Sequence, residues 1–536
     1  MKRRYILLTI IALTLVSCGG HRHGDKMIFR YNESAGIATL DPAFAKDQSI
    51  IWPCRQLYNG LIELDSALQV QPSIAKRWDI SPDGCTYTFT LRNDVRFHKS
   101  PLFRTPDSSR CVVANDFRYS FRRITDHAVA SPGAWIFNDL EDIQAPDDTT
   151  LVLRLRRPFA PFLPMLGMAY CSVVPREVVE HYGKDFRRNP CGTGPFQFQY
   201  WKEGVKLVLR KNPCYFERDT LGAPLPYLDA VAVTFIADRQ TAFLEFIKGN
   251  LDFLNSVDPA YKDLLLTPQG ELQPQHEHRI LMRTSPYLNT EYLGFQMENH
   301  NTPLRDPRLR LAINHGFDRH KMIRYLRNNI GTPATGGIIP AGLPGHNPQA
   351  GFDYDPDRTR QLLAEAGYPG GQGFPPLTLS TTASYLDLCK YIQQQLALLG
   401  MDIRIDVNPP AALRSQIAEG KIDWFRGSWV ADYPDAENYL SILYGPNRAP
   451  AGPNYTRFSD PAVDRLYQQA RQTSDPAQRA RLYRSIDSLA MLQAPVVPLY
   501  YDQIVHLTHR NVSGLCTNAM NTLDLRHLRI APAESR

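Results

Sequence analysis

Four Asp-Pro dipeptides in the second half of the chain most strongly restrict its fold. Each one precedes a segment whose apolar residues recur at helical spacing, and the four aspartates are Asp306, Asp355, Asp460 and Asp475. Aspartate suits the N-cap of a helix and proline suits its first turn, so each dipeptide predicts a helix start. A strand is predicted just after Gly400, and another follows the last helix. This alternation of helix and strand is typical of an α/β domain.

The first half of the chain is richer in strands. Apolar and polar residues alternate over 83–98, which predicts a pair of half-buried strands with a turn between them. Residues 146–158 predict an edge strand closed by a proline, and residues 195–213 predict a hairpin. A helix is predicted at 112–124, with Asn115 as its N-cap. The whole chain is therefore expected to be an α/β protein with a large β-rich insertion.

The length of 536 residues exceeds the size at which a single core stops growing, so we expect two or three domains. No 20–50-residue repeat and no low-complexity linker marks a boundary between them.

The N-terminus has the pattern of an export signal. Three basic residues precede an apolar run from Tyr5 to Val16, which is too short to span a bilayer. The stretch "LVSC" resembles a bacterial lipobox, so residues 1–17 would be removed and Cys18 would carry lipid. The alternative is an ordinary secretory signal with an incidental cysteine. Removal of residues 1–17 takes away three basic and no acidic residues, so the net charge falls from +6 to +3, which implies no nucleic-acid partner.

Eight further cysteines are scattered along the chain, at positions 54, 85, 111, 171, 191, 214, 389 and 516. An even number in an exported protein permits disulfides, but the pairing stays open. No CxxC spacing occurs, and no metal site or cofactor is predicted. The sequence also has no GxSxG nucleophile elbow and no phosphate-binding loop, so we expect no enzymatic activity.

Five blocks in order carry a family resemblance. They are residues 57–98, 191–216 with "CGTGPFQFQYWKEG", 306–323, 354–371 and "ADY" at 431–433. Together they resemble family 5 extracellular solute-binding proteins, which serve oligopeptide, dipeptide and nickel ABC importers.

The resemblance implies a bilobal flytrap fold of the periplasmic-binding-protein type, with mixed sheets in two lobes. Lobe I would comprise residues 27–60, 190–288 and 500–531, and lobe II residues 289–499. An extra β-rich domain would occupy 61–189, and residues 18–26 would be a tether. Ligand would lie between lobes that close by a hinge.

The same resemblance places a ligand-facing acid at Asp432. A buried peptide ammonium needs a carboxylate at hydrogen-bond distance, and Asp432 is of that type. Alternatively, Asp432 caps a helix that begins near Pro434, or pairs with an arginine such as Arg426. Asp435 is the better candidate for the cap, because "DAENYL" follows in helical register.

Further candidates for the ligand site are aromatic or polar. They are Trp429 and Tyr433 beside Asp432, Tyr31 and Glu33 in "YNESAG", and Tyr287, Asn289 and Tyr292 in the strand expected to cross between the lobes. Core packing or turn polarity is the alternative for each. Dipeptide-specific members are expected to offer an arginine after the fourth block, but residues 380–393 contain Lys390 as their only cation. Strict dipeptide specificity is therefore not expected.

The resemblance also implies the partners. We expect a monomeric receptor in the cell envelope, held outside the cytoplasmic membrane by lipid on Cys18, which delivers a peptide to an ABC permease and its ATPase subunits. A haem, nickel-chelate or oligosaccharide receptor on the same scaffold is the main alternative. A periplasmic hydrolase with a scattered site, and a sensor or chaperone without a permease, are the others.

Overall fold

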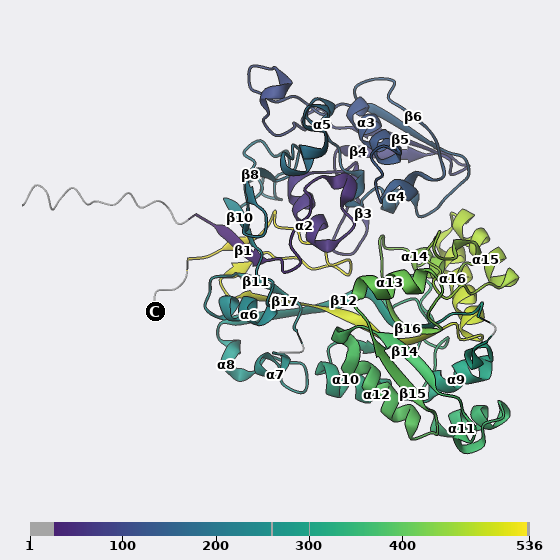
Figure 1. Ribbon diagram of the computed structural model, residues 1–536. Coiled ribbons are helices and arrows are strands. Elements are labelled where there is room, and N and C mark those ends of the chain that lie inside the picture. The colour runs from purple at the N-terminus through teal and green to yellow at the C-terminus, as the bar shows by residue number, and fades with distance from the viewer. Residues whose placement is uncertain (1–25, 259–260, 300, 533–536) are drawn as a thin grey trace, which may run out of the picture.

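The computed structural model describes residues 26–258, 261–299 and 301–532. Figure 1 shows an upper and a lower body joined by two long antiparallel strands, β12 (Ile280–Phe295) and β17 (Val496–His509). The names lobe I, lobe II and extra domain are used below for the residue ranges expected from the sequence. Both strands belong to one sheet with the order β15-β14-β16-β12-β17-β11-β1-β10-β9-β8. Within the described ranges, no helix is long and apolar enough to cross a bilayer. The predicted signal, Cys18 and most of the tether lie outside these ranges.

The lobe I part of the sheet combines strands from distant parts of the chain. It contains β1 (Ile28–Asn32), β8 (Phe196–Lys202), β9 (Lys206–Lys211), β10 (Ala230–Thr234) and β11 (Phe253–Asn255), with helices α2 (Gln48–Leu57), α6 (Arg239–Ile247), α7 (Lys262–Leu265) and α8 (Pro274–Glu277). The predicted hairpin at 195–213 is confirmed, because β8 and β9 pair directly.

The two crossing strands lose their regular pairing where they pass between the lobes. Pro286 lies opposite Gln503 and Thr290 lies opposite Tyr501, so the residues between them are out of register. A second irregularity follows at Glu291. Irregularities of this kind bend and twist a strand pair. The first half of β12 pairs with β17 alone, whereas its second half also pairs with β16.

Lobe II surrounds its part of the sheet with helices. Its strands are β13 (Thr332–Pro333), β14 (Leu377–Thr381), β15 (Ile403–Val407) and β16 (Trp424–Val430), and its helices are α9 (Pro307–His315), α10 (Arg319–Arg327), α11 (Pro356–Glu365), α12 (Leu386–Ala397), α13 (Pro410–Ala418), α14 (Glu437–Leu440), α15 (Pro461–Gln472) and α16 (Pro476–Met491). All four predicted Asp-Pro caps are confirmed, since each carboxylate accepts a first-turn N–H.

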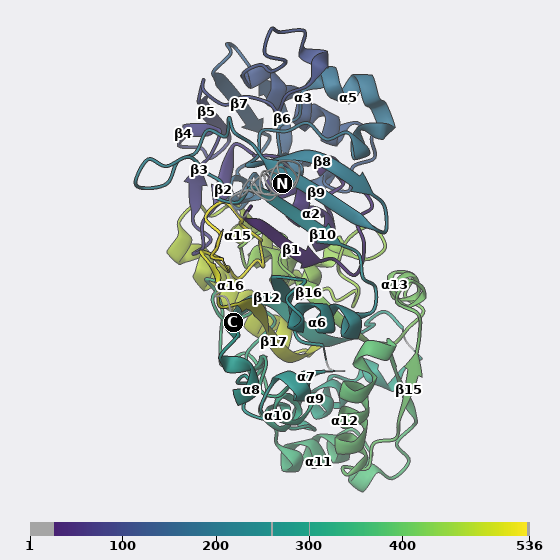
Figure 2. The same ribbon diagram turned by 90° about the vertical axis from the view of Figure 1, so that its left-hand side faces the viewer.

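The extra domain has a sheet of its own, seen at the top of Figures 1 and 2. Its strand order is β4 (Ala75–Ile80), β5 (Thr86–Leu91), β7 (Thr150–Leu155) and β6 (Leu140–Gln144), beside a hairpin of β2 (Ile62–Leu64) and β3 (Val70–Pro72). Its helices are α3 (Ala114–Thr125), α4 (Phe162–Met165) and α5 (Arg176–Tyr182).

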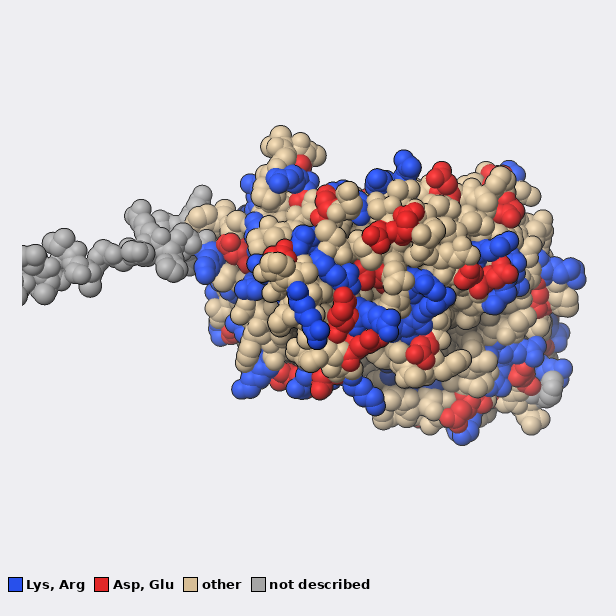
Figure 3. All heavy atoms as spheres, turned by 90° about the horizontal axis from the view of Figure 1, so that it is seen from above, with Lys and Arg blue, Asp and Glu red and all other residues tan. Residues whose placement is uncertain are grey.

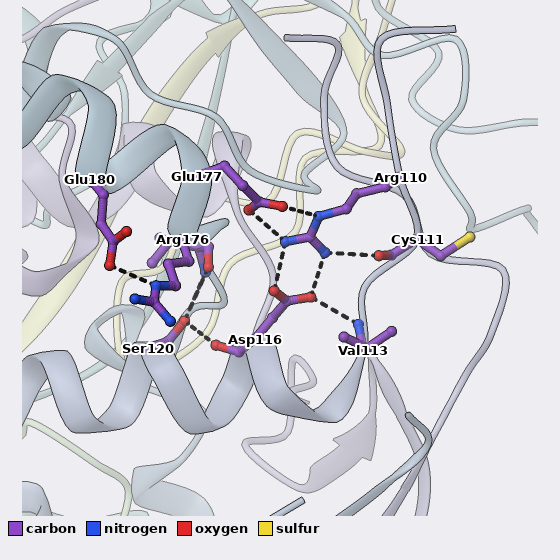
Figure 4. A network of polar contacts seen from close by, with 9 residues as sticks. Arg110, Cys111, Val113, Asp116, Ser120, Arg176, Glu177 and Glu180 are labelled. Carbon is purple, nitrogen blue, oxygen red and sulfur yellow. Dashed lines mark hydrogen bonds and ion pairs between the residues drawn. The ribbon is translucent and has the colours of Figure 1, made fainter. Parts of the chain in front are cut away.

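Ion pairs fix the helices of the extra domain to each other. Arg110 bridges Asp116 of α3 and Glu177 of α5 with four hydrogen bonds of 2.8 Å, and Asp116 also accepts from Val113 N–H at the start of α3 (Figure 4). Basic and acidic side chains intermingle on the face of the molecule seen in Figure 3.

Three local predictions for this domain were wrong. The second strand expected within 83–98 is irregular backbone, and β5 pairs with β4 and β7 instead. The strand ending before Pro158 is β7, which is interior because it pairs with β5 on one side and with β6 on the other. Pro158 does not interrupt this pairing, since it lies beyond the last paired residue, Leu155. The N-cap of α3 is Val113 and not Asn115, because Asp116 supplies the carboxylate that holds Val113 N–H.

The eight cysteines within the described ranges are all free thiols. Cys54, Cys171, Cys191 and Cys389 are buried, where they act as small apolar side chains.

Candidate ligand-binding site

Asp432 lies on the loop between β16 and α14, where a single amide fixes its position. Asp432 N–H donates to Asn438 Oδ1 at 3.1 Å, and Asn438 Nδ2 donates to Asp432 Oδ2 at 3.4 Å. The same Asn438 oxygen accepts from Trp429 Nε1 at 2.9 Å. Because Asn438 is buried, it holds two of the candidate ligand residues in a fixed relation.

Asp432 forms no ion pair with any residue that the structure describes. Its side chain reaches solvent, but protein surrounds it closely, and this desolvation raises its pKa, while the bond from Asn438 lowers it. The pKa of Tyr170, in the short helix Ala169–Cys171 of the extra domain, is raised by burial and also by the charge of Asp432. An accessible, poorly solvated and unpaired carboxylate is suited to a cation that comes from outside the protein.

The two alternative roles of Asp432 are filled by other residues. Arg426 pairs with Glu291 of β12. Asp435 holds the start of the helix, since its Oδ1 accepts Glu437 N–H at 2.9 Å where α14 begins. The N-cap residue is Ala436, so Asp435 acts from one position before the cap, and the prediction was wrong by one residue.

Trp429 and Tyr433 differ in how far they are available to a ligand. Trp429 is half-buried at the end of β16. Tyr433 is only 4% exposed, its hydroxyl donates to Glu437, and its ring lies 6.1 Å from that of Trp135 in the extra domain. The structure thus places Tyr433 in packing against the extra domain.

In lobe I, Glu33 lines a cavity of about 680 Å³. Its Oε1 accepts Ala35 N–H at 3.1 Å. Desolvation raises its pKa, while this bond and the charge of Arg239 lower it. Tyr31 instead packs in the core, with its ring 5.9 Å from that of Trp52.

The crossing strand places Tyr287 and Asn289 at its irregular point. Tyr287 is half-buried, and burial followed by the charges of Asp502 and Glu291 raises its pKa. Asn289 is buried and donates to Glu291 Oε1 at 3.1 Å, while its own Oδ1 has no partner in the described part of the chain. Tyr292, two strand positions after Thr290, is buried in the core of lobe II.

A cluster of opposite charges beside this point was missed from the sequence. Arg327 Nη2 lies 2.6 Å from Asp502 Oδ1, and Arg426 pairs with Glu291. The Arg426 guanidinium lies over the ring of Tyr385, which belongs to the arginine-free stretch 380–393. Each arginine has a carboxylate partner, so the cluster is electrically balanced.

The sheet register accounts for the pair of Glu291 and Arg426 in this cluster. Leu293 pairs with Arg426 and Glu291 pairs with Ser428, so Glu291 and Arg426 are diagonal neighbours on one face of the sheet. Their sequence separation gives no indication of this contact.

The structure therefore distributes the predicted residues over three places. Asp432 and Trp429 share one loop, Tyr287 and Asn289 lie at the crossing point, and Glu33 lines a separate cavity of lobe I. Tyr31 and Tyr292 belong to cores, and Tyr433 packs against the extra domain.

Known proteins resemble this chain over nearly its whole length. The glutathione-binding protein GsiB of Escherichia coli K12 is 26% identical over 487 residues, which is 90% of both chains. The periplasmic binding protein DppA of Helicobacter pylori, solved in complex with the peptide STSA, is 26% identical with a TM-score of 0.77, over 93% of this chain and 98% of DppA.

A third similarity extends the fold comparison. The dipeptide binding protein of Pseudoalteromonas sp. SM9913, solved with Met-Leu, has a TM-score of 0.78 at 22% identity, over 94% of this chain and all of that one. Structures of periplasmic binding proteins thus confirm the predicted bilobal α/β fold.

A family model agrees with these similarities. The model of the bacterial extracellular solute-binding proteins, family 5 Middle, matches residues 69–451. The chain therefore belongs to the family 5 bacterial extracellular solute-binding proteins.

Proposed function

We propose that this chain captures peptides between its lobes and delivers them to an ABC permease that works with ATPase subunits. Its family consists of solute-binding receptors. The names of its relatives support a peptide ligand, because GsiB binds glutathione and DppA was solved with a four-residue peptide.

The observation that carries this proposal is the unpaired carboxylate of Asp432. It would bind the α-ammonium of the peptide, and Asn438 holds it in place for that contact. Loss of one partner of a buried charged pair costs roughly 2–5 kcal/mol of affinity. Trp429 beside it supplies rigid apolar surface with a polar end.

The protein offers fewer fixed contacts to the end of the ligand that lies away from Asp432. Asn289 Oδ1, buried without a partner, is an acceptor for a backbone N–H of the ligand. Arg327 and Arg426 already have carboxylate partners, so the ligand carboxylate meets no free guanidinium in this cluster. A peptide anchored at its N-terminus and variable in length fits this arrangement. Tyr287 and Glu33 would contact its side chains.

The division into lobes is part of the proposal. Residues 27–60, 190–288 and 500–531 would move as lobe I together with the extra domain 61–189, and residues 289–499 as lobe II. The irregular pairing of β12 and β17 between Pro286 and Thr290 supports a hinge at that point.

Ligand identity is tested directly on the native protein. Protein purified without refolding is denatured, and the released small molecules are identified by mass spectrometry. Peptides support the proposal. A haem, a nickel chelate or an oligosaccharide as the released ligand overturns it, and so does hydrolysis of added peptides in place of their retention.

The location of the receptor follows the same proposal. We infer that lipid on Cys18 anchors a monomeric chain outside the cytoplasmic membrane. Cells grown with radiolabelled palmitate should label the wild type and not Cys18→Ser. A wild type that takes up no label contradicts the anchor without affecting the peptide-binding proposal.

A further inference from the structure

Lobe I and the extra domain share one hydrophobic core. Phe29 and Leu207 of lobe I belong to the same buried cluster as Phe89 and Phe117 of the extra domain. Lobe II has separate clusters of its own, and Tyr433 is its one buried residue, within the described ranges, that belongs to the shared cluster. A continuous core moves as a unit, so the extra domain follows lobe I whenever the cleft opens or closes.

The extra domain also touches lobe II, at the end of α15. Ala160 N–H donates to the carbonyl of Arg471 at 3.0 Å. Arg471 Nη2 lies 3.2 Å from Asp139 Oδ2, and its guanidinium lies 4.4 Å from the centre of the Phe159 ring. Three contacts from the extra domain therefore converge on one residue of lobe II.

The same guanidinium reaches the loop that carries Asp432. Arg471 Nε lies 3.5 Å from Glu437 Oε1. The Glu437 carboxylate also accepts the hydroxyls of Tyr467 and Tyr433, and Tyr433 is the neighbour of Asp432 in the chain.

Both carboxylates beside Arg471 keep other partners if the contact breaks. Asp139 Oδ1 also pairs with Arg157 Nε at 2.8 Å, within the extra domain. Glu437 keeps Arg471 and its two tyrosines, within lobe II. Separation of the extra domain from lobe II therefore leaves no buried charge without a partner. This is the condition for a contact that opens and closes readily.

We propose that Arg471 is a reversible latch between the extra domain and lobe II, which ties closure of the cleft to the loop of Asp432. Arg471 is a positioning residue, since it acts through Glu437 and Tyr433. The latch rests on the proposed division into lobes and not on the identity of the ligand.

The test uses the ligand-free mature protein. In Asp139→Asn the charge that faces Arg471 is lost, while Arg471 and Glu437 remain. Hydrogen exchange at the Ala160 amide, which donates across the contact, should become several-fold faster than in the wild type. Small-angle scattering should show a larger radius of gyration, and the thermal midpoint should stay unchanged.

Arg157→Gln is the matched control, because it removes the other partner of the same carboxylate without touching lobe II. It should leave exchange at Ala160 and the radius of gyration as in the wild type. Arg471→Lys keeps the charge and should give an intermediate rate. Equal Ala160 exchange in Asp139→Asn and wild type overturns the latch, as does equal acceleration by Arg157→Gln. Neither result bears on peptide binding. A protein that fails to retain peptides would contradict the peptide-binding proposal separately.

Discussion

The loop after β16 carries the carboxylates of Asp432, Asp435 and Glu437, and their surroundings set their roles. Asp435 Oδ1 accepts Tyr483 O–H at 2.7 Å and Glu437 N–H at 2.9 Å. Glu437 accepts two tyrosine hydroxyls beside Arg471. Among the residues that the structure describes, the Asp432 carboxylate is hydrogen-bonded by the amide of Asn438 alone. Asp435 and Glu437 therefore stabilise the loop, whereas Asp432 is left for a ligand.

Asp432→Asn should separate binding from stability. Desolvation raises the pKa of its carboxyl in the folded state, so ionisation costs stability at neutral pH, and the neutral asparagine should leave the thermal midpoint unchanged or slightly higher. The peptide-induced rise of that midpoint should disappear, as differential scanning fluorimetry would measure.

Asp435→Ala is the control for this experiment. It removes an acceptor of two hydrogen bonds, so the protein should melt earlier and still respond to peptide. If Asp432→Asn melts early and responds to peptide, Asp432 has a structural role instead.

Asp487 of α16 predicts a pH dependence of stability. It is fully buried, and burial raises its pKa from 3.8 to about 7, while hydrogen bonds from the N–H groups of Ile338 and Ile339 lower it. The folded state therefore holds this proton to higher pH than the unfolded state. Its contribution to the free energy of unfolding is fully present below the unfolded pKa and is lost as pH rises to about 7.

The variant Asp487→Asn isolates this effect. Relative to the variant, wild type should lose up to about 4 kcal/mol of unfolding free energy between about pH 4 and about pH 7, and nothing further above that. Urea unfolding of both proteins over a pH series measures it. A difference that is constant with pH contradicts the shifted titration.

At the scale of elements, four helices of lobe II start where an Asp-Pro dipeptide caps them. Asp475 Oδ1 accepts Ala477 N–H at 3.1 Å and Oδ2 accepts Gln478 N–H at 3.3 Å, and Pro476 follows as the first residue of α16. The other three Asp-Pro helices begin in the same way.

Asp475→Ala should lower the unfolding free energy of lobe II by about 1 kcal/mol, the usual effect of losing an N-cap. Ser474→Ala changes the adjacent exposed residue, which caps nothing, and should have no effect. Thermal unfolding followed by circular dichroism compares the two. Equal midpoints for both variants would show that proline alone sets the start of the helix.

These caps could be predicted from sequence because donor and acceptor lie within a few residues. The hairpin of β8 and β9 was predictable for the same reason. The pairing of Glu291 with Arg426 was not, because it depends on the register between β12 and β16. Asp432 was located by family resemblance, and its anchor on Asn438 required the fold of the loop.

At the scale of the whole molecule, the proposed lobes and the extra domain are linked by one pair of strands, by the contact at Arg471, by the packing of Tyr433 on Trp135 and by hydrogen bonds of Asn328 to Lys262, Asp263 and Thr267. Lobe I and the extra domain share a core, so closure is expected to be one rotation about the irregular part of β12 and β17. The contacts of lobe II with the extra domain should then form together with the ligand site.

Peptide binding should therefore make the molecule more compact. In small-angle scattering, the radius of gyration of wild type should fall when a saturating peptide is added, because the lobes rotate together. Asp432→Asn under the same conditions should not change. Equal compaction of both proteins would show that Asp432 is not required for closure.

The position of β17 has a consequence for the order of synthesis. Val496–His509 pairs with β11 in lobe I, with β13 in lobe II and with β12 along the crossing, so the shared sheet is incomplete until β17 has been made. A growing chain therefore keeps strand edges unpaired on both sides of the crossing until β17 leaves the ribosome, and unpaired edges can pair with other chains. The native sheet forms late in synthesis, after most of both lobes has been made.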